Sequence, residues 1–223
     1  MKNLTNVLVI LLCGWSLRTE AKEFPARARL LLGAVQVNPD QVNNVIEAEG
    51  LHDIEALGAY GVEISMGVWG PLDFGVRYTK RLGYVHERPN SVATDYKAEL
   101  DQDSVQLILR GNLYRGSLIR ADLFAGAGGA NTNLAIRTAS QDGELSKKAS
   151  DQDSFGSFIS SYGATLGIGY KWVYLIVEAG YEDNRISSLK RTGTASTAIR
   201  DINLSGNFVS VGLLFDGIKA SSK

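Results

Sequence analysis

Residues 59–78 read AYGVEISMGVWGPLDFGVRY, and this stretch predicts a β-hairpin. Apolar side chains occupy every second position of each arm, the period of a β-strand, and Gly70-Pro71 provides the turn. The opposite face consists largely of glycine, interrupted by the charges Glu63, Asp73 and Arg77. A soluble sheet would place larger solvated side chains there, whereas glycine suits the crowded inside of a barrel. We therefore expect the apolar face of the hairpin to face lipid.

Composition is compatible with this expectation. The chain has 223 residues, enough for one domain, and its formal net charge of -1 provides no basic field for nucleic acid. It contains 24 glycines, above the usual share of about 7%. After the N-terminus there is no apolar run of about 18 residues, which excludes a helical membrane protein.

The N-terminus has the pattern of an export signal. Lys2 supplies the positive charge, residues 7–17 form a short apolar core, and a small-x-small site predicts cleavage after Ala21, with cleavage after Ser16 as the alternative. This divides the chain into a signal peptide, residues 1–21, and a barrel domain, residues 22–223, with its strands within about 26–215. Cys13, the single cysteine, lies in the signal and follows a leucine where a lipoprotein site needs a small residue, so the mature chain has no thiol chemistry.

Eight stretches carry a strand pattern: residues 26–37, 59–69, 72–85, 104–114, 118–130, 162–171, 174–184 and 203–215. Their connections alternate between long and short, starting with a long one. The expected polar loops are residues 38–53, the segment from 87, residues 131–155 and residues 191–200. An even strand number with every second connection short predicts an all-β fold, an eight-stranded antiparallel up-and-down transmembrane β-barrel with both termini in the periplasm. Closure removes the unpaired strand edges that lipid would not tolerate.

Aromatic residues near both ends of the outward faces are typical of the two interfacial girdles of such barrels. The last strand, residues 210–215, has Gly212 within it and Phe215 at its end. With these features the chain resembles the small eight-stranded outer-membrane barrels of Gram-negative bacteria, which include OmpX-like and OmpW-like proteins and the transmembrane domain of outer-membrane protein A. The resemblance implies that Gly212 and Phe215 belong to a signal for the barrel assembly machinery. In that family the aromatic residue is commonly the last, whereas residues 216–223 follow here.

The inward positions collect charges of both signs. Because the interior of an eight-stranded barrel is only wide enough for side chains, these charges must pair, and we predict an ion-pair network that closes the lumen. Its members are Glu63, Arg77, Arg81, Arg110, Arg120, Asp122, Lys171 and Glu178, with Asp73 and Glu182 as further inward carboxylates.

Register makes this network more specific. We expect Glu63 opposite Arg77 or one diagonal step away. A three-residue turn at 115–117 would place Arg110 opposite Asp122, and Asn112 opposite Arg120.

Residues able to carry chemistry are few. His52 and His86 have no ligands at metal-binding spacing and are expected to be solvated, so no metal or cofactor is predicted. The run GAGGA at residues 126–130 precedes no helix and is interpreted as a row of small inward residues rather than a phosphate loop. The basic pairs Lys147-Lys148 and Lys190-Arg191 could contact anionic lipopolysaccharide.

We therefore expect a monomeric, non-enzymatic barrel with a structural or surface-interaction role carried by its extracellular loops. The expected partners are outer-membrane lipid including lipopolysaccharide, the assembly machinery and an unidentified surface partner, but not nucleic acid. The alternatives are a narrow channel for small solutes and an enzyme that modifies outer-membrane lipid. The enzyme would need a histidine beside a strand serine and a carboxylate, which neither histidine has by sequence.

Overall fold

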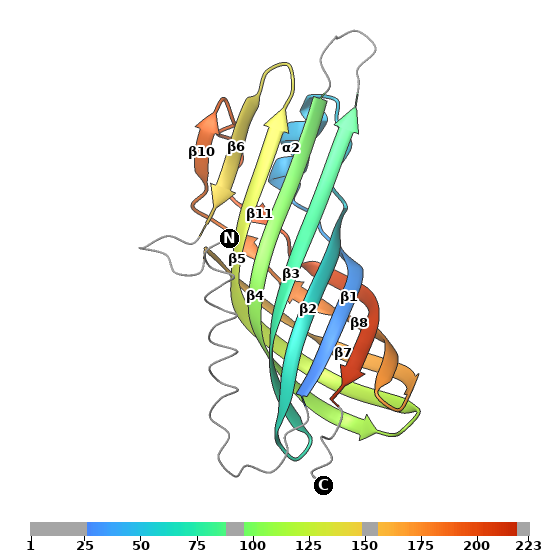
Figure 1. Cartoon of the computed structure of the whole chain (residues 1–223). Helices are drawn as coiled ribbons and strands as arrows, with labels where there is room; N and C mark the ends of the chain where they lie inside the picture. The colour runs from blue at the N-terminus through green and yellow to red at the C-terminus, as the bar shows by residue number, and fades with distance from the viewer. Residues whose placement is uncertain (1–25, 88–95, 149–155, 218–223) are drawn as a thin grey trace.

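Eight long antiparallel strands close into a barrel (Figure 1). The computed structural model describes residues 26–87, 96–148 and 156–217. The barrel strands are β1(Ala26–Gln36), β2(Ala56–Trp69), β3(Leu72–Glu87), β4(Tyr96–Arg115), β5(Ile119–Arg137), β7(Ser157–Tyr170), β8(Val173–Asp183) and β12(Gly206–Asp216). Closure comes from the pairing of β12 with β1, and the predicted up-and-down barrel is confirmed. The predicted signal peptide with its cleavage site at Ala21 lies outside the described residues.

The β2–β3 hairpin has one of the two registers that the sequence left open. Glu63 lies directly opposite Arg77 in the ladder, and Gly70 adopts the positive φ of 53° that the tight turn requires. Tyr60, Val62, Ile64 and Met66 are exposed on the outer face, while Gly61, Glu63 and Ser65 are buried. The face assignment made from glycine and charge therefore holds.

The β4–β5 hairpin differs from the predicted register. Arg110 lies opposite Phe124, and Asn112 lies opposite Asp122. A bulge between Asn112 and Tyr114, together with a turn closed by the hydrogen bond from Gly116 N to Ile119 O, shifts the ladder relative to a turn at 115–117. The predicted pairs Arg110 with Asp122 and Asn112 with Arg120 are therefore wrong as ladder pairs.

Polarity inverts along the unbroken strand β4. In its second half, outward Val105, Leu107 and Leu109 alternate with buried Gln106 and Arg110. In its first half the pattern is reversed: Leu100, Ala98 and Tyr96 are buried, whereas Lys97, Glu99, Asp101 and Asp103 are partly exposed. β5 shows the same inversion, with Leu134 and Ile136 buried beyond Ala130. Along both strands the outer face thus changes from apolar to polar, and the inner face from polar to apolar, without a break in the strand.

The long ends of β3, β4 and β5 extend beyond the barrel, and the elements gathered around them form a part that we call the head (Figure 1). It contains α2(Asp40–Ala48), β6(Asp142–Lys147), β9(Arg185–Ile186), β10(Lys190–Gly193) and β11(Ile202–Asn203). β6 pairs with the end of β5, β10 pairs with β6, and β9 pairs with β11. The head and the top of the barrel share one apolar core, which includes Val42, Ile46, Leu134, Leu145 and Ile202.

The expectation of polar loops at 38–53, 131–155 and 191–200 is therefore wrong for much of the described chain. α2 forms because Pro39 precedes it, Asp40 lies in its first turn, and Val42 and Ile46 are spaced four residues apart on the buried side. Its end is followed by Gly50 with a φ of 83°. Within the described ranges, no helix is both long and apolar enough to cross a membrane.

Candidate functional site

Six charged side chains from six strands meet inside the barrel, and we call them the ion-pair cluster: Arg29, Glu63, Arg77, Arg110, Asp122 and Glu178. Glu63 lies at its centre with no exposed side-chain surface. Its carboxylate accepts hydrogen bonds from Arg29 (2.7 Å), Arg77 (2.8 Å) and Arg110 (2.7 Å). One carboxylate thus connects β1, β2, β3 and β4.

The remaining partners balance the charge of the cluster. Glu178 lies 2.6 Å from Arg77 and 2.8 Å from Arg110, and Thr165 donates to it at 3.2 Å. Asp122 contacts Arg110 at 2.5 Å, diagonally across the shifted β4–β5 ladder. Three arginines therefore face three carboxylates, an arrangement that offsets the desolvation of each ion.

The Phe124 ring covers this cluster, and Phe208 packs on Phe124. The guanidinium carbons of Arg110 and Arg77 lie 4.8 Å and 5.0 Å from the centre of the Phe124 ring, and Phe208 lies 6.1 Å from Phe124. Phe124 faces Gly163 in the ladder, and a Cβ on Gly163 would meet the Phe124 ring at 2.9 Å. A glycine is needed there because a Cβ would also lie 2.3 Å from the carbonyl oxygen of Ala179 on β8. The rings add packing and cation–π contact to the ion pairs.

A second charged layer, the rim layer, lies nearer the short turns and comprises Arg27, Asp73, Arg115, Arg120 and Asp216. Asp73 contacts Arg27 at 2.5 Å and Arg115 at 2.7 Å. Asp216 contacts Arg27 at 2.9 Å and also binds Arg120, whose guanidinium lies 4.4 Å from the Tyr174 ring centre. Since Asp216 follows Phe215, the closing strand β12 is bonded by a side chain both to β1 and to β5.

Replacing Asp216 by asparagine is expected to lower the free energy of unfolding by about 1–3 kcal/mol, because Arg27 and Arg120 lose a shared charged partner in a partly buried site. The measurement is urea-induced loss of the compact, heat-modifiable form on gels. Asp183→Asn, at an exposed ion pair with Arg185, is the control and should unfold at nearly the wild-type urea concentration. Equal midpoints for wild type and Asp216→Asn would contradict the role of Asp216 in closure.

Beyond the phenylalanine rings lies the upper polar layer: Arg81, Gln102, Ser104, Gln106, Ser161 and Glu182. Arg81 pairs with Glu182 and donates to Ser104 at 2.9 Å. Gln102 donates to Thr132 at 2.8 Å and accepts from Asn184 at 2.8 Å. The apolar core shared with the head follows above this layer.

The predicted lumen residues thus distribute over three layers. Glu63, Arg77, Arg110, Asp122 and Glu178 meet in the cluster, Arg120 lies in the rim layer and Arg81 in the upper layer. Sequence reasoning missed Arg27, Arg29, Asp216 and Phe124. Arg27 and Arg29 could have been found, because they alternate with the outward residues Ala28 and Leu30.

The assignment of Lys171 to the lumen is wrong. Lys171 lies in the two-residue turn between β7 and β8 with a φ of 58°, and its ammonium lies 5.2 Å from the Tyr170 ring centre. The turn begins one residue earlier than expected, so Lys171 is exposed outside the barrel wall.

Gly212 and Phe215 both lie in β12, the strand that closes the barrel. A Cβ on Gly212 would lie 2.0 Å from the carbonyl oxygen of Leu30 on β1, so the two strands approach closely there. The Phe215 ring lies 6.4 Å from the Trp172 ring at the neighbouring turn. The seam between the first and last strands therefore depends on a small residue at one level and packs an aromatic pair at its end.

Apolar side chains cover the outside of the barrel over all eight strands, and we call them the apolar belt. Exposed members include Leu32, Val62, Phe74, Leu107, Leu123, Leu166, Leu175 and Val211. Trp69, which is 78% exposed, Tyr170 and Trp172 lie at its turn end, and Tyr60, Tyr162 and Phe158 lie at its other end. Such exposure over a whole barrel is far more than a monomeric soluble protein displays.

A polar row ends the belt on the β3–β4 side. Tyr78 donates to Asp103, and Lys80, just above the belt, contacts Asp101 at 2.7 Å and Asp103 at 3.5 Å. On β4, charged side chains replace the apolar ones on the outer face from Asp103 toward the head, whereas on β3 the exposed Leu82 and Tyr84 follow Lys80.

Both histidines lie at the head end of the molecule: His52 between α2 and β2, and His86 near the end of β3. His52 is exposed, with its Nε2 3.1 Å from Glu87, and the His86 ring stacks on Tyr84 at 6.0 Å. Over the described ranges, no group of three or more His, Cys, Asp or Glu side chains has the arrangement of a metal site.

The two basic pairs lie on neighbouring strands of the head. Lys190 faces Ser146 in the β6–β10 ladder, one position from Lys147. Arg191 donates to the carbonyl oxygens of Ser196 and Ile199, so its charge is partly engaged within the head.

Comparison with known proteins gives similarity of structure alone, since no family model and no curated protein sequence matches the chain. Ail, the attachment invasion locus protein of Yersinia pestis, solved with the heparin analogue sucrose octasulfate, has 11% identity and a TM-score of 0.47, covering 87% of this chain and 99% of its own. Neisserial surface protein A has 13% identity and a TM-score of 0.44, covering 88% and 99%. The outer membrane protein OprG of Pseudomonas aeruginosa has 12% identity and a TM-score of 0.49, covering 86% and 94%. At these values none of their activities extends to this chain.

Proposed function

We propose that this chain is an integral outer-membrane barrel with a closed lumen, whose functional contacts are made by the head outside the membrane. The observation that carries the proposal is the arrangement of polarity: apolar side chains outside, paired charges inside. A barrel in water would instead bury its apolar side chains and expose its charged ones, because a buried ion pair stabilises a fold less than an apolar core does. In lipid, the apolar outer face of each strand contacts hydrocarbon, and the charged inner face finds its partners within the lumen.

The proposal places the head on the outer side of the membrane, opposite the short turns. The short turns of β2–β3, β4–β5 and β7–β8 lie at one end, as periplasmic turns do, and the head lies at the other. On the head, the outer face of β4, β5 and β6 presents charges of both signs, among them Lys97, Glu99, Arg137 and Glu144. Such a surface is suited to a polar partner, including lipopolysaccharide sugars and phosphates, and requires no catalytic group.

Location is tested first by cell fractionation with heat-modifiable gel migration. Recovery with outer membranes, and faster migration before boiling than after, is the expected result. A soluble periplasmic product would refute the proposal.

Topology is tested by single cysteines, for which the predicted mature chain supplies no background. Ala139→Cys, between β5 and β6, should react with a membrane-impermeant maleimide in intact cells. Ser117→Cys, in the β4–β5 turn, should react only after the outer membrane is permeabilised. Both positions are exposed, so their folding risk is comparable. The reverse labelling pattern would invert the proposed orientation.

Closure of the lumen predicts that the purified, folded protein gives no stable conductance steps in planar bilayers. The ion-pair cluster, the two phenylalanine rings and the apolar core are stacked along the axis, and the cavity among them measures only about 30 Å³. An open porin in the same lipid is the positive control. Reproducible unitary steps from this chain would favour the channel alternative instead.

A further inference from the structure

Among the described residues, buried polar atoms without a hydrogen-bond partner occur in all three layers of the lumen, and three of them lie in the upper polar layer. Arg81, Gln106 and Glu182 are each 2–3% exposed. Yet Arg81 Nε, Gln106 Nε2 and Glu182 Oε1 have no hydrogen-bond partner among the described residues. Leaving such a group unpaired in a buried site is costly, and native proteins rarely do so.

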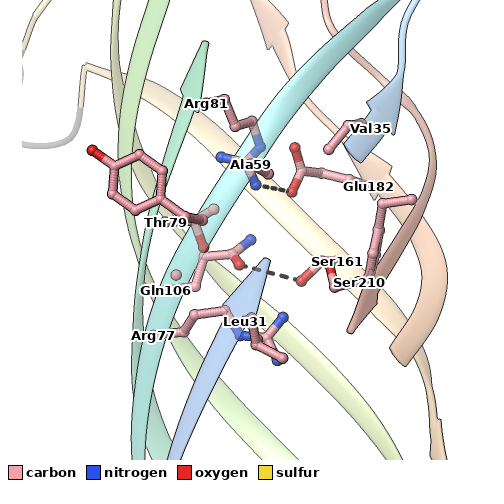
Figure 2. Close-up of a pocket in the computed structure, with 13 residues that line it drawn as sticks. Leu31, Val35, Ala59, Arg77, Thr79, Arg81, Gln106, Ser161, Glu182 and Ser210 are labelled. Atoms are coloured by element: carbon pink, nitrogen blue, oxygen red, sulfur yellow. Dashed lines mark hydrogen bonds and ion pairs between the residues drawn. The ribbon is translucent and has the colours of Figure 1, made fainter. Parts of the chain in front are cut away.

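All three residues line the same cavity (Figure 2). The Arg81–Glu182 pair lies on one side of it and the hydrogen bond from Ser161 to Gln106 Oε1, 3.3 Å, on the other. Thr79 and Ser210 also contribute to the lining. The cavity volume of about 30 Å³ is sufficient for one or two water molecules.

We propose that this cavity is a binding site for one or two ordered water molecules, held by Gln106, Arg81 and Glu182. Water fits because it accepts from Gln106 Nε2 and Arg81 Nε while donating to Glu182 Oε1. A cation is disfavoured by the Arg81 guanidinium and an anion by the Glu182 carboxylate, and an apolar occupant would leave all three atoms unpaired. The site lies inside the barrel, between the ion-pair cluster and the apolar core shared with the head.

Gln102 provides an internal comparison on the same strand. Its side chain is also buried, but its amide nitrogen donates to the Thr132 hydroxyl at 2.8 Å and its oxygen accepts from Arg81 and Asn184. Two buried glutamines, four residues apart, therefore differ in one respect: Gln106 has a free amide nitrogen and Gln102 does not.

The test is the transfer of magnetisation from water to side-chain amides, measured by NMR on the folded wild-type chain in detergent micelles. The Gln106 amide protons should show a cross-peak at the water resonance from a bound water molecule, and the Gln102 amide protons should show none. Both amides are assigned through their own backbone correlations, so no variant is needed.

Two outcomes overturn the proposal. Absence of the cross-peak at Gln106 would mean that no water is bound, and equal cross-peaks at Gln102 and Gln106 would mean that water fills the lumen without a site. Relay through the neighbouring hydroxyl is tested by Ser161→Ala, in which the Gln106 cross-peak should persist. Its loss in that variant would likewise count against bound water.

Discussion

Glu63→Gln is expected to lower the free energy of unfolding by about 3–5 kcal/mol, or to prevent the compact form altogether, because it removes one partner of a buried ionic group. Glu63 accepts hydrogen bonds from Arg29, Arg77 and Arg110 and is fully buried. Glutamine keeps the shape but donates from one end, so three arginines would share two carboxylates, Asp122 and Glu178. Arg29 is affected most, because its other carboxylate, Asp122, lies 3.6 Å away.

The measurement is equilibrium unfolding in urea, followed by tryptophan fluorescence and by heat-modifiable migration. Glu99→Gln is the matched control, since Glu99 also pairs with a cation, Lys97 at 3.0 Å, but on the exposed outer face. Its change should stay below about 1 kcal/mol. If both variants unfold alike, burial of Glu63 has no energetic consequence and the cluster is not what holds the barrel.

Phe124→Ala is expected to destabilise the barrel by about 3–5 kcal/mol, the usual range for truncating a buried phenylalanine. The ring is 4% exposed, packs on Phe208 and covers Gly163. Its loss opens a void in a lumen that has no spare side chain to fill it. Arg77 and Arg110 would lose the aromatic face that lies about 5 Å from each guanidinium.

Two further variants separate packing from cation–π contact. Phe124→Leu restores most of the volume without the aromatic face and should recover part of the loss. Phe158→Ala removes a ring of equal size from the lipid-facing belt, where Phe158 is 65% exposed, and should cost less than Phe124→Ala because it opens no void in the lumen. A Phe124→Ala barrel as stable as the Phe158→Ala barrel would contradict the packing role.

Much of the barrel could be predicted because lipid and lumen impose opposite demands on alternate residues. The alternation over residues 60–68 predicted a strand and its two faces, and Gly70-Pro71 limited the register to Glu63 opposite Arg77, as observed, or one diagonal step away. Local pattern and turn chemistry suffice there, because the partner strand is adjacent in sequence.

The β4–β5 register could not be derived in the same way. The bulge near Leu113 depends on how two strands fit around the turn, and nothing in the residues 112–114 marks it. Arg110 and Asp122 nevertheless meet, because long side chains reach diagonally across the shifted ladder. Lys171 was misplaced for a related reason: a non-glycine residue with positive φ gave no turn signal.

The head was missed because its strands are short and its partners are distant in sequence. β6 and β10 form one ladder although more than 40 residues separate Lys147 from Lys190. The sequence of α2 did contain a helical pattern, since Val42 and Ile46 are four residues apart and follow a proline. The turn-forming residues around this segment favoured its interpretation as a loop.

The inversion of polarity within β4 has a consequence for how the protein responds to bilayers of different thickness. A shift of two residues toward the periplasm would carry Asp103 and Lys80 toward the hydrocarbon, and a shift of two residues the other way would bring Val105 into water. Each residue advances the strand by about 3.4 Å, so both penalties arise within a small displacement. The barrel is therefore fixed in depth, and a membrane that is too thick or too thin must adjust its lipids around it. Because β3, β4 and β5 continue without a hinge into the head, that fixed depth also sets a constant height for the head above the lipid surface.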